Sequence, residues 1–306
     1  MSNSGLRKVM YLATLSLLAF SSSALAQDLG PTLEKVRATG VLTLGVREAT
    51  VPFSYLDGNQ RAVGYSMDLC TRVGEAVKER LGLGALTVKD VVVSTATRIP
   101  LLVNGTIDIS CDAATNTLER QKQVSFALTH FLAAGRVMVK ADSGIKSLED
   151  LRGKTVVSTA GSTNLSLIMA LNRERDLGLN ILSGRDHGES FLMLQTGRAA
   201  AFIMDDVLSA GVAATAHDAK NYVFTDEFLS LEPYGLIVRR NDSQFEDVVN
   251  DTLRNIYTSG EINKIYEKWF SSPIPPNNIT LNLPMSDAFK KQVASPIASA
   301  NPADYK

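Results

Sequence analysis

Residues 98–111, which read RIPLLVNGTIDISC, contain the change of pattern that decides the fold. The apolar stretch 99–103 predicts a short helix that Asn104-Gly105 ends, and residues 106–111 predict a strand directly after it. Another strand is expected at 88–93, immediately before this helix. A strand, a helix and a second strand in succession favour an α/β fold with a mostly parallel sheet.

The same alternation extends along the chain in both directions. We expect further strands at 41–46, 155–159 and 199–204, and further helices at 33–38, 67–77, 162–172 and 192–195. Ser66 is expected to cap the helix at 67–77. A long final helix is expected at 245–270, with an interruption near Ser259-Gly260. Residues 271–306 are rich in Pro, Ser and Asn, and we expect them to cover the surface with little regular structure.

The N-terminus has the pattern of an export signal. Arg7 and Lys8 precede an apolar run at 9–20, and Ala24-Leu25-Ala26 follows as a cleavage site. The apolar run is too short to cross a bilayer, which takes roughly 20 residues. Cleavage would leave 280 residues with no cysteine at the new N-terminus, so we expect neither a lipid anchor nor a later membrane span. The alternative, a buried N-terminal helix, fits this order of segments less well.

Length and charge exclude several classes of protein. A chain of 280 residues is long enough for two domains, and loss of Arg7 and Lys8 changes its formal charge from −1 to −3. This balance gives no reason to expect nucleic acid or an anionic membrane as a partner. Cys70 and Cys111 either form a disulfide or remain buried thiols. No Cys and His spacing suggests a zinc site, no cofactor is expected, and a monomer is the default expectation.

Three arginines mark the expected ligand site. Arg47 follows one predicted strand, Arg98 lies between a strand and a helix, and Arg120 lies downstream of Thr115. Ligands of open α/β sheets bind beyond the carboxyl ends of the strands, where these side chains should gather. A guanidinium group pairs well with a carboxylate because its planar fork donates two parallel hydrogen bonds. The alternative for each arginine alone is a solvated surface position.

Further polar residues could complete such a site. Ser162 and Thr163 follow a glycine at a predicted helix start, where backbone N–H groups favour an anion, although either hydroxyl could simply cap the helix. Asp205 and Asp206 end an apolar strand and could pair with an ammonium group or cap the next helix. His187 is expected in a polar loop.

Several motifs together resemble a known family. Residues 98–108 are similar to the R-x-P-x-L-x-x-G-x-x-D pattern of bacterial polar amino acid-binding proteins, solute-binding protein family 3, which serve ABC importers. Residues 52–55, 64–68, 117–120 and 259–270 are similar to other parts of that pattern. The segments 46–48, 186–188, 204–206 and 273–276 resemble its glutamate/aspartate branch. The resemblance covers roughly residues 33–276.

The resemblance implies a type II periplasmic binding protein fold, in which two α/β lobes are joined by two hinge strands. The first lobe would contain residues 27–132 and 236–306, including a C-terminal extension at 271–306, and the second lobe residues 133–235. It also implies roles for nine site residues. Arg98 and Thr115 would bind the ligand's α-carboxylate, Asp205 its ammonium group, and Arg47, Arg120 and His187 its side-chain carboxylate, with Thr95, Ser162 and Thr163 adding hydrogen bonds. Ala113 stands near the position where the pattern has Ser, so one hydroxyl contact is missing.

The expected function follows from these roles. The chain would bind L-glutamate or L-aspartate in the periplasm, close its lobes around the ligand and deliver it to the membrane permease subunits of an ABC importer. Two alternatives stay open. One is a dehydratase-like enzyme on the same scaffold, and the other is a ligand-sensing module for a receptor. No Ser-His-Asp order or metal set supports catalysis.

Overall fold

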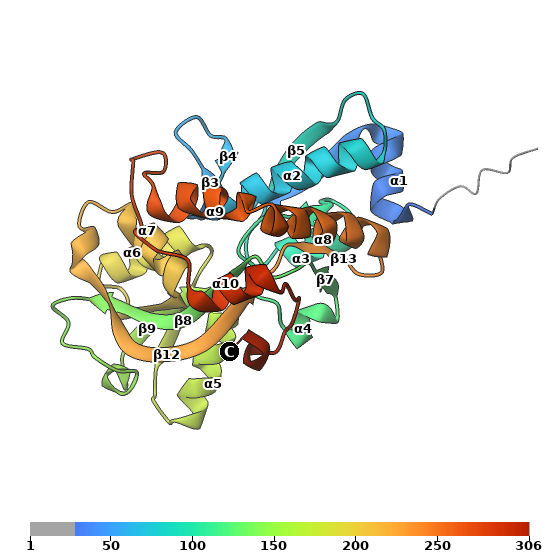
Figure 1. Cartoon of the computed structure of the whole chain (residues 1–306). Coiled ribbons are helices and arrows are strands. Elements are labelled where there is room, and N and C mark those ends of the chain that lie inside the picture. Colours follow the sequence, from blue (N-terminus) through green and yellow to red (C-terminus); the bar gives the residue numbers. More distant parts are fainter. Residues whose placement is uncertain (1–27, 306) are drawn as a thin grey trace, which may run out of the picture.

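The computed structural model describes residues 28–305, and the expected export signal at 1–26 lies outside the described residues. Two five-stranded sheets form the centres of two lobes (Figure 1). The first sheet contains, in spatial order, β5 (Thr87–Val92), β1 (Val41–Val46), β6 (Ile109–Ser110), β13 (Ile237–Arg239) and β7 (Val124–Phe126). The second contains β10 (Asn180–Gly184), β9 (Thr155–Thr159), β11 (Ala201–Asp205), β8 (Phe131–Lys140) and β12 (Tyr222–Tyr234).

Each sheet is half parallel and half antiparallel, rather than mostly parallel as the sequence suggested. In the first sheet β1 pairs in parallel with β5 and β6, whereas β13 is antiparallel to β6 and β7. In the second sheet β9 is parallel to β10 and β11, whereas β8 is antiparallel to β11 and β12. The parallel pairs are those joined through helices, and the reversed strands are those where the chain passes directly between the sheets.

Two long strands connect the lobes. The chain passes from β7 of the first sheet into β8 of the second, and it returns from β12 of the second sheet into β13 of the first. β8 and β12 are paired, with Leu132 opposite Pro233 at the end nearest the first lobe. An isolated bridge joins Thr115 to Tyr234 at the same place. Residues of the first lobe are thus hydrogen-bonded directly to the returning strand.

Helices cover both sheets (Figure 1). Those flanking the first sheet are α1 (Gly30–Thr39), α2 (Tyr65–Arg80), α3 (Arg98–Val103), α4 (Leu118–Gln121), α8 (Ser243–Thr258) and α9 (Glu261–Tyr266) with the π-helical turn η3 (Glu267–Ser271). Those of the second lobe are α5 (Thr163–Glu174), α6 (His187–Gln195) and α7 (Asp206–Ala214), with short 3-10 turns η1 (Glu149–Leu151) and η2 (Ala219–Asn221). No described helix is both long and apolar enough to span a membrane.

The start of α2 differs from the expectation. Ser66 does not cap this helix, which begins at Tyr65 after Gly64, and the Ser66 hydroxyl instead donates to the Asp112 carbonyl over 3.0 Å. Gly64 has φ 140°, and a Cβ atom there would lie 2.2 Å from the Phe53 carbonyl oxygen. A small three-stranded sheet, β2 (Ala49–Thr50), β3 (Ser54–Leu56) and β4 (Ala62–Val63), precedes it.

Other expected elements are found with shifted bounds. The helix expected at 33–38 is α1, and Gly40 ends it with φ 68°. The strand expected at 106–111 is reduced to β6, because the buried Asp108 carboxylate accepts hydrogen bonds from Thr43 N (2.8 Å) and Lys35 Nζ (2.6 Å). The long final helix is divided into α8, α9 and η3 near Gly260, where an interruption was expected.

Cys70 and Cys111 form a disulfide that ties α2 to the residue after β6, with a Cα–Cα distance of 6.1 Å. The sequence had left free thiols open as the alternative.

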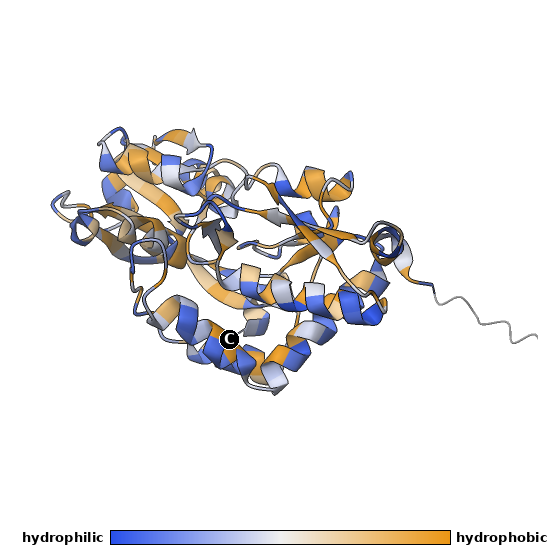
Figure 2. Ribbon diagram, turned by 90° about the horizontal axis from the view of Figure 1, so that it is seen from above, coloured by the Kyte–Doolittle hydropathy of each residue, from blue (hydrophilic) through white to orange (hydrophobic). Residues whose placement is uncertain are grey.

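An aromatic cluster fills the space where the first lobe meets the crossover strands. The ring of Phe53 lies 5.0 Å from that of Phe131 and 5.4 Å from that of Tyr234, and Phe270 lies 5.0 Å from Phe131. Figure 2 shows the hydrophobic residues concentrated on the inner strands and the hydrophilic ones on the outer faces of the helices. Burial of several aromatic rings together strongly stabilises this junction.

The C-terminal extension is more regular than the sequence suggested. It contains α10 (Asp287–Ala294) and the 3-10 turn η4 (Pro302–Tyr305). α10 packs against α8 and β8, and η4 packs against β12. Phe289 is buried in the aromatic cluster, and the Tyr305 hydroxyl lies 2.7 Å from the Thr129 hydroxyl. The prediction failed because Pro and Ser around α10 masked a short amphipathic helix that Ser286 caps.

Candidate functional site

A small, largely closed cavity lies between the two lobes. Nine of the ten residues nominated from the sequence line it. From the first lobe these are Thr95, Arg98, Ala113, Thr115 and Arg120, and from the second Ser162, Thr163, His187 and Asp205. Met204 and Leu208, which the sequence did not single out, complete the lining. Strand ends and helix starts distant in sequence thus converge on one polar cavity, as open α/β sheets allow.

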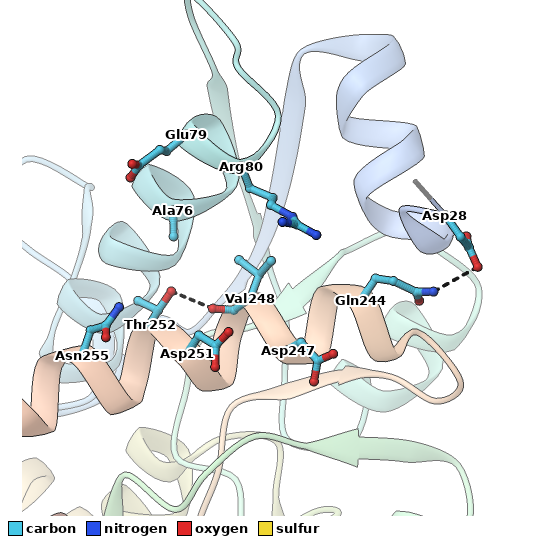
Figure 3. Close-up of a pocket in the computed structure, with 10 residues that line it drawn as sticks. All are labelled: Asp28, Ala76, Glu79, Arg80, Gln244, Asp247, Val248, Asp251, Thr252 and Asn255. Carbon is cyan, nitrogen blue, oxygen red and sulfur yellow. Dashed lines mark hydrogen bonds between the residues drawn. The ribbon is translucent and has the colours of Figure 1, made fainter. Parts of the chain in front are cut away.

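A larger hollow on the first lobe has different properties (Figure 3). It lies between α2 and α8, and its volume is about 640 Å³. Its charged side chains, among them Glu79, Arg80, Asp247 and Asp251, are exposed to solvent. Exposed charges are hydrated and screened, so they provide little affinity for a small ligand. The cavity between the lobes is therefore the candidate site.

Arg98 is held rigidly at the first-lobe side of the cavity. It is the first residue of α3 and is 2% exposed. Its Nη1 donates to Asp112 Oδ2 over 2.8 Å and to the Ala113 carbonyl over 3.2 Å, whereas its Nε has no hydrogen-bond partner among the described residues. Hydrogen bonds from Nη1 thus fix the orientation of the guanidinium group, while other N–H donors stay free to bind a ligand carboxylate.

Arg47 is the nominated residue that does not line the cavity. It directly follows β1, is 2% exposed, and donates from Nη1 to Asp112 Oδ2 over 3.3 Å. Burial raises the pKa of Asp112, but Arg98 and Arg47 outweigh this effect and hold that pKa below its ordinary value. Asp112 is therefore an ionised carboxylate between two guanidinium groups, and Arg47 is paired with it just outside the cavity lining.

Arg120 spans the two lobes. Thr117 caps α4 by accepting a hydrogen bond from the Arg120 backbone N–H over 3.2 Å, which fixes the backbone position of Arg120 in the first turn of α4. The guanidinium group donates to the Thr115 carbonyl (2.8 Å) and to the Gly161 carbonyl of the second lobe (3.1 Å). Burial, and then the charge of Arg98, lower the pKa of Arg120 to about 10, so it remains a cation at neutral pH.

The start of α5 supplies the hydroxyls opposite. The Ser162 hydroxyl accepts a hydrogen bond from the Leu165 N–H over 3.0 Å, so Ser162 is a helix cap as well as part of the cavity lining. The Thr163 hydroxyl donates to Glu232 Oε2 over 2.9 Å. The N-terminus of this twelve-residue helix therefore lies at the cavity, where its dipole favours a negative group.

Asp205 provides a buried carboxylate at the end of β11. Asn164 Nδ2 donates to its Oδ1 over 2.6 Å, and the Tyr234 hydroxyl donates to its Oδ2. Burial and the negative charge of Glu232 raise the pKa of Asp205 to about 8, although both hydrogen bonds act in the opposite direction. The adjacent Asp206 does not line the cavity, and its carboxylate accepts from the backbone N–H groups of Ala134 and Val207.

His187 is not in a loop, as the sequence suggested, but is the first residue of α6. The Asp186 side chain caps this helix by accepting from the Glu189 N–H over 2.8 Å. The His187 Nδ1 lies 3.0 Å from the Thr159 hydroxyl. Burial, followed by the charges of Arg47 and Arg98, lowers the pKa of His187 well below its ordinary value, so the ring is neutral at pH 7.

The fold and cavity agree with one protein family. The family model of the bacterial extracellular solute-binding proteins, family 3, matches residues 42–272. The chain belongs to this family. The match extends through both sheets and the two crossover strands, so it includes every residue that lines the cavity.

Similar proteins within this group have names that refer to acidic amino acids. The chain is 47% identical over 281 residues to the L-glutamate/L-aspartate-binding protein of Pseudomonas aeruginosa, covering 92% of this chain and 93% of that protein. It is 42% identical over 288 residues to the glutamate/aspartate import solute-binding protein of Escherichia coli K12, covering 93% and 95%. These relatives are transport binding proteins, and this chain is accordingly a binding protein and not an enzyme.

Solved structures agree on the fold. A mutant ArgBP from T. maritima superposes with a TM-score of 0.70 at 29% identity, covering 78% of this chain and 99% of that one. The two-lobed periplasmic binding protein fold expected from the sequence is confirmed.

Proposed function

We propose that this chain captures L-glutamate or L-aspartate between its lobes and delivers it to the membrane permease subunits of an ABC importer. The observation that carries the proposal is a single cavity lined by two guanidinium groups, of Arg98 and Arg120, and by the carboxylate of Asp205. An acidic amino acid has the complementary set, two carboxylates and one ammonium group. The names of the relatives from P. aeruginosa and E. coli agree with this set of charges.

The α-carboxylate would bind to Arg98. The unused edge of its guanidinium group can donate two parallel hydrogen bonds, and the hydroxyl of Thr115 lines the same side of the cavity. The ammonium group would lie against Asp205 of the second lobe. A single ligand therefore joins both lobes through its backbone groups, whichever acidic side chain it carries.

The side-chain carboxylate would lie near Arg120, the neutral ring of His187 and the start of α5. Thr95, Ser162 and Thr163 line this cavity and can add hydroxyl contacts. The Thr95 hydroxyl is buried without a hydrogen-bond partner among the described residues, so a ligand oxygen would satisfy it. Ala113 offers no hydroxyl, which leaves the Arg98 contact more important. An amide in place of the carboxylate would leave charge uncompensated, at a cost of several kcal/mol.

Closure of the lobes would follow ligand binding. We place the hinges at the lobe boundaries after residue 132 and before residue 236, where the chain crosses between the sheets, so that residues 133–235 move as the second lobe. The Arg120–Gly161 hydrogen bond forms only when the lobes meet. A protein of this kind would act as a periplasmic monomer after export, and its closed form would be what the permease recognises.

The test is isothermal titration of the mature chain, unfolded and refolded to remove carried-over ligand. Glutamate, aspartate, glutamine, asparagine and arginine are each titrated under the same conditions. Micromolar or tighter binding confined to glutamate and aspartate is the expected result. Equal affinity for the amides, or binding of arginine instead, would refute the proposal that the cavity selects a ligand with a side-chain carboxylate.

A further inference from the structure

Glu232 lies on the crossover strand β12, was not nominated from the sequence and does not itself line the cavity. The residue is 4% exposed. Its Oε2 accepts a hydrogen bond from the Thr163 hydroxyl over 2.9 Å, and its Oε1 accepts one from the Ser230 hydroxyl. Both of these partners are neutral, so they satisfy the carboxylate as donors but do not offset its charge. Glu232 is therefore a buried acidic group in contact with the cavity lining.

The same strand also holds the carboxylate that lines the cavity. Tyr234 lies two residues after Glu232 and on the same face of β12, because alternate residues of a regular strand point to the same side. The Tyr234 hydroxyl donates to Asp205 Oδ2. β12 thus holds one cavity-lining residue, Asp205, through Tyr234. It holds a second, Thr163, through Glu232.

The first two residues of α5 join the two carboxylates from the other side. Thr163 donates to Glu232. The next residue, Asn164, donates from Nδ2 to Asp205 Oδ1 over 2.6 Å. Gly135 of β8 packs here so closely that a Cβ atom on it would lie 2.7 Å from Asn164 Oδ1. All these residues lie on the second sheet or on α5, so the arrangement does not depend on closure of the lobes.

The charges that act on Asp205 come from several elements. Burial raises the pKa of Asp205 to about 8, and the negative charge of Glu232 is the next largest cause. Asp206, at the start of α7, acts in the same direction, whereas the hydrogen bond from Tyr234 acts in the opposite one. On β8 the residue opposite Asp205 is Gly135, which carries no charge. The other charged or titratable side chains that line the cavity are those of Arg98, Arg120 and His187.

We propose that Glu232 is a positioning residue of the ligand site, which holds Thr163 at the cavity and places a second negative charge next to Asp205, where the ligand's ammonium group would bind. The inference rests on the proposed binding of an acidic amino acid and adds a residue of the crossover strand to it. A buried carboxylate that is bonded only to hydroxyl groups is costly, and the ammonium group of a ligand reduces this cost. The strand that connects the lobes thus supports both of these second-lobe residues of the site.

Two variants of Glu232 separate its hydrogen bond from its charge. Titration calorimetry of the refolded mature chain measures glutamate affinity as a function of pH. Glu232→Ala removes both features and should weaken binding about tenfold at about pH 8. Glu232→Gln keeps a carbonyl oxygen that can accept from the Thr163 hydroxyl, so its affinity at this pH should stay within about threefold of that of the unmodified chain. Because the neighbouring charge is lost, the pH above which affinity stops rising should fall by about one unit in Glu232→Gln.

A variant of Thr163 tests the route by which Glu232 acts. Thr163→Val removes the hydroxyl donor, keeps the shape of the side chain and should weaken binding at least as much as Glu232→Ala. If Glu232 acts through this hydrogen bond, adding Glu232→Ala to Thr163→Val should cost less than about threefold more. Asp226→Asn, at an exposed carboxylate of the same strand, is the matched control and should change neither the affinity nor its pH dependence.

A role of Glu232 in folding alone predicts a different pattern. Glu232→Gln would then bind as weakly as Glu232→Ala, its pH profile would coincide with that of the unmodified chain, and the losses in the double variant would add. Any of these three results would overturn the inference. Should Glu232→Ala fail to fold, as circular dichroism would show, the pH profile of Glu232→Gln still decides the matter.

The two proposals fail differently. If the unmodified chain binds neither glutamate nor aspartate, the proposed function is wrong and the inference falls with it. If the unmodified chain binds them and the Glu232 variants follow the pattern of a role in folding, only the inference about Glu232 is wrong.

Discussion

The guanidinium group of Arg120 donates a hydrogen bond to the backbone carbonyl of Gly161 over 3.1 Å, and the two residues belong to different lobes. Gly161 comes so close to the first lobe that a Cβ atom there would lie 2.8 Å from the Cα atom of Ala96. Gly161 also has φ 75°, which favours glycine. The lobes are therefore closed on each other in this structure, with a cation at the contact.

Replacement of this cation should weaken closure and ligand binding together. Arg120→Ala removes the hydrogen bond to Gly161 and a donor to the proposed side-chain carboxylate, so we expect glutamate affinity to fall about 100-fold, in line with charged hydrogen bonds worth about 1.5–3 kcal/mol. Titration calorimetry of the variant measures the change. Arg254→Ala, at an exposed arginine of α8, is the control. Unchanged affinity in Arg120→Ala would remove Arg120 from the site.

Arg98 should be essential for every amino acid ligand. It is the proposed receptor of the α-carboxylate, which all of them share, so Arg98→Ala should abolish detectable binding of glutamate and aspartate alike. Arg98→Lys keeps the charge but loses the planar fork, and we expect it to restore only part of the affinity. Calorimetric titration of both variants, with circular dichroism to verify folding, makes the comparison. Normal binding by Arg98→Ala would show that the ligand lies elsewhere.

Ligand binding should release a proton from Asp205. In this closed structure burial raises the pKa of Asp205 to about 8, so without a ligand ammonium group beside it the carboxyl is largely protonated at pH 7. A ligand ammonium group favours the ionised form. Affinity should therefore rise with pH from about 6 to 8, by at most about tenfold per pH unit for one proton. The same shift stabilises the closed chain without ligand below about pH 4, and this stabilisation is lost as the pH rises through about 8.

Titration at pH 7 in buffers of different ionisation enthalpy counts the released protons. We expect a value between zero and one that disappears in Asp205→Asn, together with most of the affinity. Asp90→Asn removes another carboxyl whose pKa is raised by burial, but one that does not line the cavity, and it should leave proton release intact. Identical binding heats in all buffers would contradict the proposed role of Asp205.

The C-terminal extension should contribute substantially to stability. The Phe289 side chain is 1% exposed, and its ring lies 6.0 Å from that of Phe131 and 6.1 Å from that of Tyr266. Phe289→Ala should lower the free energy of unfolding by about 3–5 kcal/mol, because it leaves a cavity in a packed aromatic cluster. Urea unfolding followed by tryptophan fluorescence measures this, with the exposed Lys290→Ala as control. Equal midpoints for both variants would mean that the extension does not stabilise the lobe junction.

Most of the fold could be predicted from the sequence because recognisable turn and cap residues separate its alternating strands and helices. Turns such as Asn104-Gly105 and caps such as Ser162 are local signals, and the structure places the elements close to the expected positions. The reversed strands β8 and β13 were not predicted, because antiparallel pairing depends on where the chain re-enters a sheet and not on local sequence. The helix α10 was not predicted because the Pro and Ser residues around it obscured its short amphipathic pattern.

Site residues were predicted correctly where a charged side chain follows the end of a predicted strand, as at Arg98 and Asp205. Arg47 follows the same rule in sequence, yet the structure pairs it with Asp112 and leaves it outside the cavity lining. The pairing depends on the register of β1 against β6, which brings the ends of both strands together. Met204 and Leu208 carry no polar group, so nothing in their side chains marked them as part of the lining.

The central claim is that one acidic amino acid bridges the two lobes, and small-angle X-ray scattering tests it most directly. The refolded, ligand-free mature chain is measured alone, with saturating glutamate and with the same concentration of glutamine. We predict that glutamate decreases the radius of gyration as the lobes close around it, while glutamine at that concentration leaves the open form unchanged. An unchanged radius of gyration with glutamate, at a concentration shown by calorimetry to saturate the protein, would contradict the claim.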